Sequence, residues 1–438
     1  MIALRLDEIA DLCPGRLERA AWADEVTGVQ IDSRRVAEGD LFVAVGGGGD
    51  FAKHAFARGA AAVLLPEDAF ASLGALGGTV RARSSAQVVG ITGSTGKTST
   101  RDILAAIVRP HARTIAAERN FNNELGVPLT LCRLEPDTEV CIVELGMRGF
   151  GQIRALCEVA RPTIGVITNI APVHLELLGS LEGVARAKAE LLAELPAGAS
   201  AVVPSEAPEL EPFLQRADLH YTRFGTGGDV RLCSFERLNG NAKVEVEIFG
   251  ERLELTFAFG ARYQARNALA ALGAYRALRL PLAGASAGAS ALRLTSWRGE
   301  ELPLPGGGVL LNDCYNANPL SMQAALGDLA ERAAGRRRVA VLGEMAELGP
   351  EAPEFHRAVG RAAVEAGVGL LVAVGGEARA YVEAAAEIST TRFAASAAEA
   401  IPLVEELVRP GDAVLVKGSR SVGLEVVADA LERTAVTA

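Results

Sequence analysis

The sequence predicts an α/β protein whose sheets are mainly parallel. An apolar run at 88–92 leads into a glycine-rich turn and then a helical pattern that reaches 108, the order of a strand, a loop and a helix. Strand and helix patterns alternate through 301–438, which is typical of a parallel, doubly wound sheet. Short strand patterns fill 201–259, where 244–248 alternates apolar and charged residues, and this favours an antiparallel sheet at the side.

Length and charge narrow the class of protein. The chain has 438 residues, which corresponds to about two to four domains, and 49% of its residues are hydrophobic. The formal net charge of −10 argues against a nucleic-acid-binding face, because such a face needs clustered basic residues.

The sequence favours a protein that is neither secreted nor inserted into a membrane. The N-terminus has acidic residues early and lacks the apolar segment of a signal peptide. No uncharged run reaches the roughly 18 residues of a membrane span. Six cysteines without a Cys-x-x-Cys pair fit reduced thiols. We expect a soluble cytoplasmic protein that binds no nucleic acid and has no membrane span.

Residues 1–84 form the first expected domain. A helical pattern at 4–12 and another at 52–58 accompany strand patterns at 29–34, 41–45 and 61–65. The turn Asp32-Ser33-Arg34 could hold a nucleotide diphosphate, although taken alone it is more simply a surface turn.

The turn at 93–99 has the composition of a phosphate-binding loop. Its glycines allow backbone N–H groups to point inward at anionic oxygens, and the following helix adds its positive N-terminal end. Lys97 could reach the β- and γ-phosphates, and the Thr98 hydroxyl could bind Mg²⁺. A strict Walker pattern would place a glycine at Ile91, so a plain glycine-rich turn with a solvated lysine is the alternative. The expected nucleotide contacts are Gly93, Ser94, Thr95, Gly96, Lys97, Thr98 and Ser99.

Two further strands end in groups that could complete this site. The strand at 140–144 ends at Glu144, and the strand at 163–170 is followed by His174. Because ligands lie beyond the carboxyl ends of parallel strands, we expect both side chains near the loop, where they suit a Mg²⁺ site. Ser180 is typical of a helix N-cap, and the helix at 181–195 that follows carries Lys188.

The remaining chain completes the domain pattern. A helix at 261–278 contains Asn267, and the central domain is expected at 85–300. The last domain, 301–438, has strand patterns at 309–311, 339–342, 370–374 and 413–416, with no Gly-x-Gly-x-x-Gly fingerprint for a dinucleotide.

Four segments resemble the Mur ligases, the ATP-dependent enzymes that add amino acids to the peptidoglycan precursor. They are Asn-Phe-Asn-Asn-Glu-Leu-Gly-Val-Pro at 120–128, Asn-Asp-Cys-Tyr-Asn-Ala-Asn-Pro at 312–319, Gly-Glu-Met-Ala-Glu-Leu-Gly at 343–349 and Val-Lys-Gly-Ser-Arg at 416–420. The segment 312–319 is the most specific and is similar to the branch that adds D-alanyl-D-alanine. The resemblance covers the whole chain, and its Gly-x-x-Gly-Lys-Thr loop is the form that this family uses.

The resemblance implies a reaction and three domains. The expected protein adds D-alanyl-D-alanine to UDP-N-acetylmuramoyl-tripeptide through an acyl phosphate, uses ATP and Mg²⁺, and is a monomer. Residues 1–84 would bind the UDP precursor, 85–300 would bind ATP on a P-loop-type parallel sheet with the antiparallel side sheet, and the Rossmann-like 301–438 would receive the dipeptide.

The resemblance also implies roles for individual residues. The expected catalytic residues are Lys97, Glu144, His174 and Lys188. The expected metal-binding residues are Thr98, Glu144, His174 and Lys188. The lysine that corresponds to Lys188 can be carbamylated in related ligases. ATP would also contact Asn267, Arg298 and Asp313. The precursor would contact Ser33, Arg34, Asn122 and Asn123, and the dipeptide Tyr315, Asn316 and Asn318.

The chain departs from the family at three places, and two alternatives stay open. Tyr263 replaces a usual histidine, Arg119 replaces a usual glycine, and Asp50 is not followed by Gly-His. One alternative is another ligase of this fold, such as folylpolyglutamate synthase, which the Asp-Ser-Arg turn and the Asn-Ala-Asn-Pro string argue against. The other is a P-loop switch that binds nucleotide without ligation; the chain lacks the Asn-Lys-x-Asp of a GTP switch.

Overall fold

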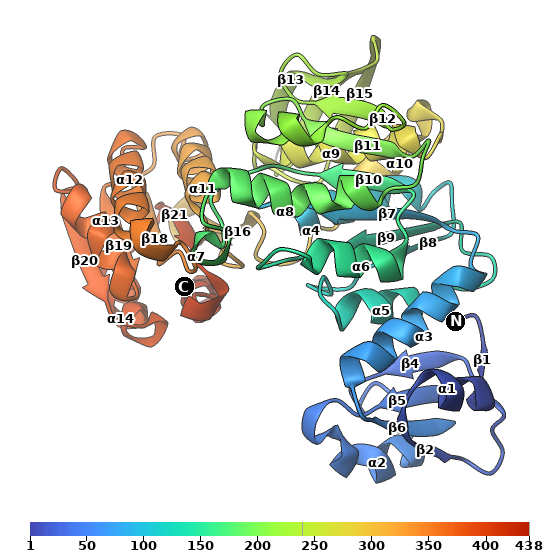
Figure 1. The fold of residues 1–438 in the computed structure, drawn as a ribbon. Coiled ribbons are helices and arrows are strands. Elements are labelled where there is room, and N and C mark those ends of the chain that lie inside the picture. Colours follow the sequence, from blue (N-terminus) through green and yellow to red (C-terminus); the bar gives the residue numbers. More distant parts are fainter. Residues whose placement is uncertain (239, 438) are drawn as a thin grey trace.

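The chain folds into three α/β units that follow one another along the sequence (Figure 1). The structure is a computed structural model and describes residues 1–238 and 240–437. The predicted fold class is confirmed, since each unit is built on its own sheet and the two larger sheets are mainly parallel. None of the helices within these residues is long and apolar enough to cross a membrane.

The N-terminal unit holds a small mixed sheet with strand order β2-β6-β5-β4. Its strands are β2 (Gly15–Arg19), β4 (Gly28–Gln30), β5 (Asp40–Val43) and β6 (Ala62–Pro66), and β1 (Leu4–Arg5) pairs separately with β3 (Glu25–Val26). Helices α1 (Leu6–Leu12) and α2 (Ala52–Ala57) accompany it. Helix α3 (Ala69–Arg83), which the sequence patterns did not predict, starts at an Asp68 N-cap and leads into the central unit.

The central unit is organised on one nine-stranded sheet. In spatial order the strands are β15 (Glu251–Phe257), β14 (Asn241–Ile248), β13 (Val230–Leu238), β12 (His220–Phe224), β11 (Ser200–Pro204), β10 (Ile164–Ile167), β7 (Gln87–Thr92), β9 (Val140–Glu144) and β8 (Thr114–Ala116). The expected antiparallel strands are β13 to β15, and they continue the parallel sheet instead of standing beside it. Strands β11 and β12, within the same expected span, are parallel.

Helices cover both faces of this sheet. One core contains Val89 and Ile91 with α4 (Lys97–Val108), α9 (Gln264–Ala277) and α10 (Ala285–Ser290). The other contains Val88 with α5 (Gly126–Leu131), α6 (Gln152–Ala160) and α8 (Leu181–Glu194), next to the short α7 (Leu175–Leu178). Burial on both faces explains why β7 reads as a continuous apolar run and not as an alternating one.

The C-terminal unit is a doubly wound sheet, as predicted. Its order is β16 (Glu300–Leu304), β17 (Gly308–Asn312), β21 (Ala413–Lys417), β18 (Arg338–Gly343), β19 (Leu370–Val374) and β20 (Thr390–Ala394), of which only the edge strand β16 is antiparallel among the described pairs. Helices α11 (Pro319–Arg332), α12 (Ala352–Glu365) and α13 (Arg379–Ala384) pack on one face, and α14 (Ala397–Leu407) and α15 (Glu425–Thr437) on the other.

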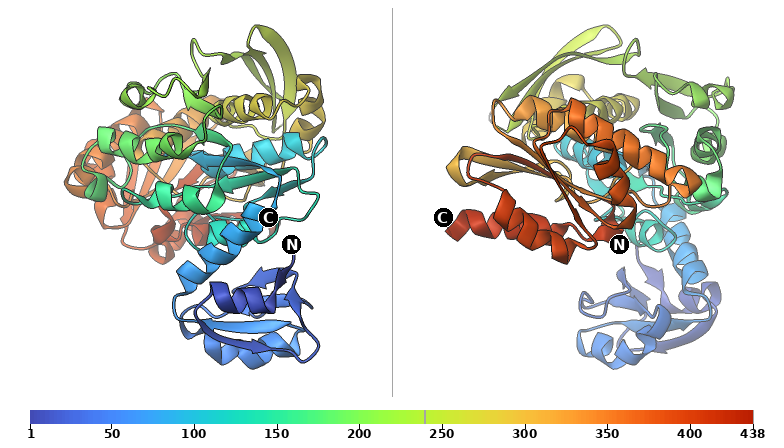
Figure 2. Two further views of the ribbon diagram at one scale, coloured as in Figure 1. Left: turned by 45° about the vertical axis from the view of Figure 1, so that its right-hand side comes forward. Right: turned by 90° about the vertical axis from the view of Figure 1, so that its left-hand side faces the viewer.

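The three units are arranged around the central one. In the further views the N-terminal unit lies at one end of the central unit and the C-terminal unit lies against its side (Figure 2). We propose domain limits of 1–84, 85–300 and 301–438 for these units, because the four-stranded sheet ends before 84 and the second limit falls within one residue of the start of β16 at Glu300.

The backbone conformation at Arg119 explains why glycine is usual at this position, and it gives a prediction. Arg119 has a φ of 49°, in the left-handed region that favours glycine, and its side chain is exposed. Arg119→Gly should therefore raise the free energy of unfolding by about 0.5–1 kcal/mol, measured by chemical denaturation. Arg119→Ala is the matched control, because it removes the same side chain and keeps the Cβ. Equal stability of the two variants would contradict the strain.

Candidate active site

A cavity of about 500 Å³ lies between the central and C-terminal units. The predicted residues that line it are Ser94, Thr95, Gly96, Lys97, Thr98, Ser99, Asn122, Glu144, Asn267, Arg298, Asp313, Tyr315, Asn316 and Asn318. The loop after β7 and the segment after β17 therefore face the same space, although more than 200 residues separate them in the sequence.

The loop after β7 is shaped for an anionic ligand. Gly96 has a φ of 79°, and a Cβ there would come within 2.2 Å of the Asn267 side-chain oxygen, so glycine is required. Helix α4 begins directly at Lys97 and directs its positive N-terminal end at the cavity. The Lys97 ammonium donates to the Gly93 carbonyl at 2.6 Å, and burial lowers its pKa to about 8 against the opposing attraction of Glu144.

Two residues that sequence reasoning missed hold this loop. The Asn169 side chain accepts from the Thr95 N–H at 2.9 Å and donates to the Thr95 hydroxyl at 2.7 Å. The Thr168 hydroxyl donates to the Thr95 carbonyl. Both follow β10, which pairs with β7 in parallel, so the strand-end argument that selected His174 would also have found them.

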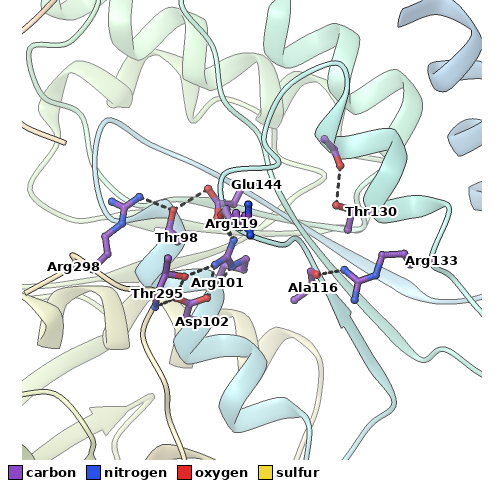
Figure 3. Close-up of polar contacts among 11 residues, drawn as sticks. Thr98, Arg101, Asp102, Ala116, Arg119, Thr130, Arg133, Glu144, Thr295 and Arg298 are labelled. Carbon is purple, nitrogen blue, oxygen red and sulfur yellow. Dashed lines mark hydrogen bonds and ion pairs between the residues drawn. The ribbon is translucent and has the colours of Figure 1, made fainter. Parts of the chain in front are cut away.

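The Glu144 carboxylate is fully buried beside the loop (Figure 3). One of its oxygens accepts from the Thr98 hydroxyl at 3.2 Å, and the other accepts from the Arg101 guanidinium at 2.7 Å. Burial raises the pKa of Glu144, and the positive charges of Arg101, Arg298 and Lys97 oppose that rise. Arg298 also donates to the Thr98 hydroxyl at 3.0 Å.

The charge of Lys97 acts on both His174 and Lys188. His174 precedes α7 in a left-handed conformation and is hydrogen bonded to Glu347 of the C-terminal unit. Burial lowers the His174 pKa; Glu347 opposes this, and Lys188 and Lys97 add to it. Lys188 is only 2% exposed, and burial followed by repulsion from Lys97 lowers its pKa well below the usual value. Lys188 is therefore not a solvated helix lysine.

The oxygen donors beside the loop suit a hard cation whose coordination a bound ligand would complete. Within the part of the chain that the structure describes, no three His, Cys, Asp or Glu side chains form a metal cluster. Thr98 and Glu144 nevertheless present two oxygen donors next to a phosphate-type loop. Mg²⁺ is commonly held in this way, by one or two carboxylates together with phosphate oxygens and water.

The C-terminal wall of the cavity is fixed by a lysine that sequence reasoning assigned no role. Lys417, at the end of β21, is 2% exposed and donates to the Asp313 carboxylate at 2.7 Å and to the Asn316 carbonyl at 2.9 Å. Asn318 caps α11 by accepting from the Ser321 N–H at 2.9 Å. The Tyr315 ring lies 3.8 Å from the Arg298 guanidinium, which places Tyr315 at the boundary between the two units.

Tyr263, which replaces the usual histidine, also lines the cavity. Burial and the neighbouring Asp313 charge raise its pKa well above the usual value, so it is a neutral phenol there.

Six predicted residues lie outside this cavity lining: Gly93, His174 and Lys188, whose contacts are given above, and Ser33, Arg34 and Asn123. The Ser33 hydroxyl is hydrogen bonded to the His54 ring at 3.0 Å, and Arg34 is exposed and paired with Asp32; both belong to the N-terminal unit. The Asn123 side chain accepts from the N–H of Gly126, the first residue of α5, at 3.0 Å. The structure thus gathers the nucleotide and C-terminal residues in one place, and leaves Ser33 and Arg34 on a separate unit.

Comparisons with known proteins agree with this arrangement. Residues 91–275 match the model of the Mur ligase middle domain, and 297–420 match the Mur ligase glutamate ligase domain. A UDP-N-acetylmuramoyl-tripeptide--D-alanyl-D-alanine ligase of Mycobacterium tuberculosis is 34% identical, over 98% of each chain. A crystal structure of MurF from Acinetobacter baumannii superposes with a TM-score of 0.85 at 28% identity, over 98% of this chain and 99% of the other.

A nucleotide-bound relative has the same architecture. MurF ligase from Thermotoga maritima in complex with ADP superposes with a TM-score of 0.80 at 26% identity, over 94% of this chain and 98% of the other. The predicted resemblance is confirmed by sequence and by structure: this chain belongs to the Mur ligase family.

Proposed function

We propose that this protein is an ATP-dependent ligase that joins D-alanyl-D-alanine to UDP-N-acetylmuramoyl-tripeptide in peptidoglycan precursor synthesis. The observation that carries the proposal is that the phosphate-type loop at 93–99 and the Asn-Ala-Asn-Pro segment at 316–319 line one cavity. The first is suited to a nucleotide triphosphate, and the second carries the residues similar to the D-alanyl-D-alanine-adding branch. Full-length similarity to ligases of that activity supports it.

The first chemical step is phosphoryl transfer. A carboxylate oxygen of the tripeptide attacks the γ-phosphorus of ATP, the bond from that phosphorus to the ADP oxygen breaks, and an acyl phosphate forms. Catalysis of such a transfer is mostly positioning and charge neutralisation. Lys97 and the loop amides neutralise the phosphates, and Asn267, Arg298 and Asp313 hold the nucleoside side of the cavity.

A bound Mg²⁺ would neutralise phosphate charge at this site. Thr98 and Glu144 would hold it, because their oxygens already meet beside the loop. His174 and Lys188 would also serve this metal site, which is supported by the effects of the Lys188 and Lys97 charges on the His174 pKa and of Lys97 on the Lys188 pKa.

The second step forms the amide. The dipeptide nitrogen attacks the acyl carbon, the C–O bond to phosphate breaks, and the nitrogen releases a proton. Tyr315, Asn316 and Asn318 would position the dipeptide from the C-terminal wall. Ser33 and Arg34 would bind the uridine diphosphate end, and Asn122 and Asn123 the peptide of the precursor. Because the site uses ATP we place the reaction in the cytoplasm, and because one chain lines the whole cavity we expect a monomer.

The test is phosphate release against a small panel of precursors. Sustained turnover should need ATP, a UDP-N-acetylmuramoyl-tripeptide and D-alanyl-D-alanine together, and omission of any one should stop it. A folate substrate with glutamate tests the alternative of folylpolyglutamate synthase. Slow hydrolysis that ignores every acceptor would instead identify a nucleotide switch and overturn the proposal.

A further inference from the structure

Arg101 is a buried guanidinium at the centre of the network in Figure 3. It lies on α4, four residues after Lys97, and its side chain is only 4% exposed. One terminal nitrogen donates to the Glu144 carboxylate at 2.7 Å and to the Arg119 carbonyl at 2.6 Å. The other donates to the Asp102 carboxylate at 2.6 Å and to the Thr295 hydroxyl at 2.9 Å. A single planar group therefore contacts the nucleotide site and a remote segment at once.

That remote segment is the linker to the C-terminal unit. Thr295 lies between α10 and β16, and both its N–H and its hydroxyl are bonded to the same Asp102 oxygen at 2.8 Å. Three residues further on, Arg298 donates to Thr98 and stacks on Tyr315. The linker is thus attached to the phosphate-loop helix at two points before the C-terminal sheet begins.

We propose that Arg101 is a positioning residue that orients the Glu144 carboxylate and, through Asp102 and Thr295, sets the linker that places Arg298 and the C-terminal unit over the nucleotide. The proposal rests on the ligase function above, since it concerns how the nucleotide-binding residues of the central unit and the dipeptide-binding residues of the C-terminal unit are placed relative to each other. Arginine suits this task because its fork of donors has a fixed geometry, which a lysine ammonium lacks.

Loss of the Glu144 contact of Arg101 and loss of its Thr295 contact should have different effects on nucleotide binding and on turnover. Loss of the Glu144 contact would leave a buried carboxylate without its main partner, beside Lys97, and should disturb nucleotide binding itself. Loss of the Thr295 contact should leave the nucleotide loop intact and misplace the linker. Turnover should then fall by more than nucleotide affinity, because the phosphate loop is kept and only Arg298 and Asp313 are displaced, a division that a merely structural role would not produce.

The variants follow from this geometry. Thr295→Val keeps the β-branched shape and the backbone bond to Asp102, and removes the hydroxyl that accepts from Arg101 and donates to Asp102. Arg101→Lys keeps a cation for Glu144 but cannot reach Asp102 and Thr295 at the same time. Arg101→Met removes both contacts. The matched controls are Arg109→Lys, exposed at the end of the same helix, and Thr256→Val, exposed on β15.

The measurements are MgADP binding by calorimetry, steady-state kinetics, and small-angle scattering with and without MgADP and precursor. Thr295→Val and Arg101→Lys should each lower kcat about tenfold, raise the MgADP Kd by about threefold at most, and reduce ligand-induced compaction. Their combination should be no worse than either alone, because both remove one shared contact. Arg101→Met should in addition weaken MgADP binding about tenfold or more.

The outcomes separate this inference from the proposed function. If the wild-type protein turns over and Thr295→Val and Arg101→Lys behave like their controls, the coupling is absent and the inference fails. The inference would also be contradicted if the decrease in kcat of the double variant, Thr295→Val with Arg101→Lys, equalled the product of the two single decreases. If the wild-type protein releases no phosphate with both substrates, the proposed function fails. In that case MgADP binding by calorimetry and compaction by scattering still decide whether Arg101 connects nucleotide binding to the position of the linker.

Discussion

Lys97→Ala should lower kcat by about 10²–10³-fold in a protein that remains folded. Lys97 is a charge-stabilising donor held in place beside the phosphates by the loop, and removal of one such donor typically costs that much. The fold should not suffer, because burial lowers the Lys97 pKa to about 8. A base with a lowered pKa has its charged form disfavoured by folding at neutral pH, so its loss should leave the melting temperature unchanged or higher.

Steady-state kinetics and a thermal melt without nucleotide check both parts. Lys243→Ala is the matched control, because Lys243 lies on β14 in a surface pair with Glu254. Near-normal turnover of a folded Lys97→Ala protein would contradict the assignment of 93–99 as the phosphate-binding loop.

Lys188→Ala should lose most activity, and short carboxylic acids should restore part of it. Burial and repulsion from Lys97 lower the Lys188 pKa well below its usual value, and this favours the neutral amine, the form that reacts with CO₂. The nitrogen then forms a bond to the CO₂ carbon and releases a proton, which leaves an anionic carbamate. Such a group replaces a cation by two hard oxygens near His174 and Lys97, where a second Mg²⁺ would bind.

The modification itself is measurable apart from activity. The wild-type protein in ¹³C-bicarbonate should show a carbamate signal by NMR, and Lys188→Ala should lack it, whereas Lys243→Ala should retain it. A fully active Lys188→Ala protein, or a wild-type spectrum without a carbamate signal, would refute the role of Lys188 as a modified lysine.

The parts of the site that the sequence determined by itself are those carried by contiguous residues. The strand, loop and helix at 87–108 could be read directly, since the glycines, Lys97 and Thr98 act through their own backbone geometry. Glu144 could be placed beside them because the end of a buried strand is visible as the end of an apolar run. The doubly wound C-terminal sheet followed from its regular alternation of strands and helices in the same way.

Only the tertiary structure decided which charges are buried and which residues are joined over long distances in the sequence. Nothing in the pattern around Lys188 distinguishes a buried amine from a solvated one, because burial depends on what packs over α8. The contact of Arg101 with Thr295 joins residues 194 positions apart, and that of Lys417 with Asp313 joins residues 104 apart. Local propensity carries no information about such pairs, since they arise only when segments that are distant in the sequence pack against each other.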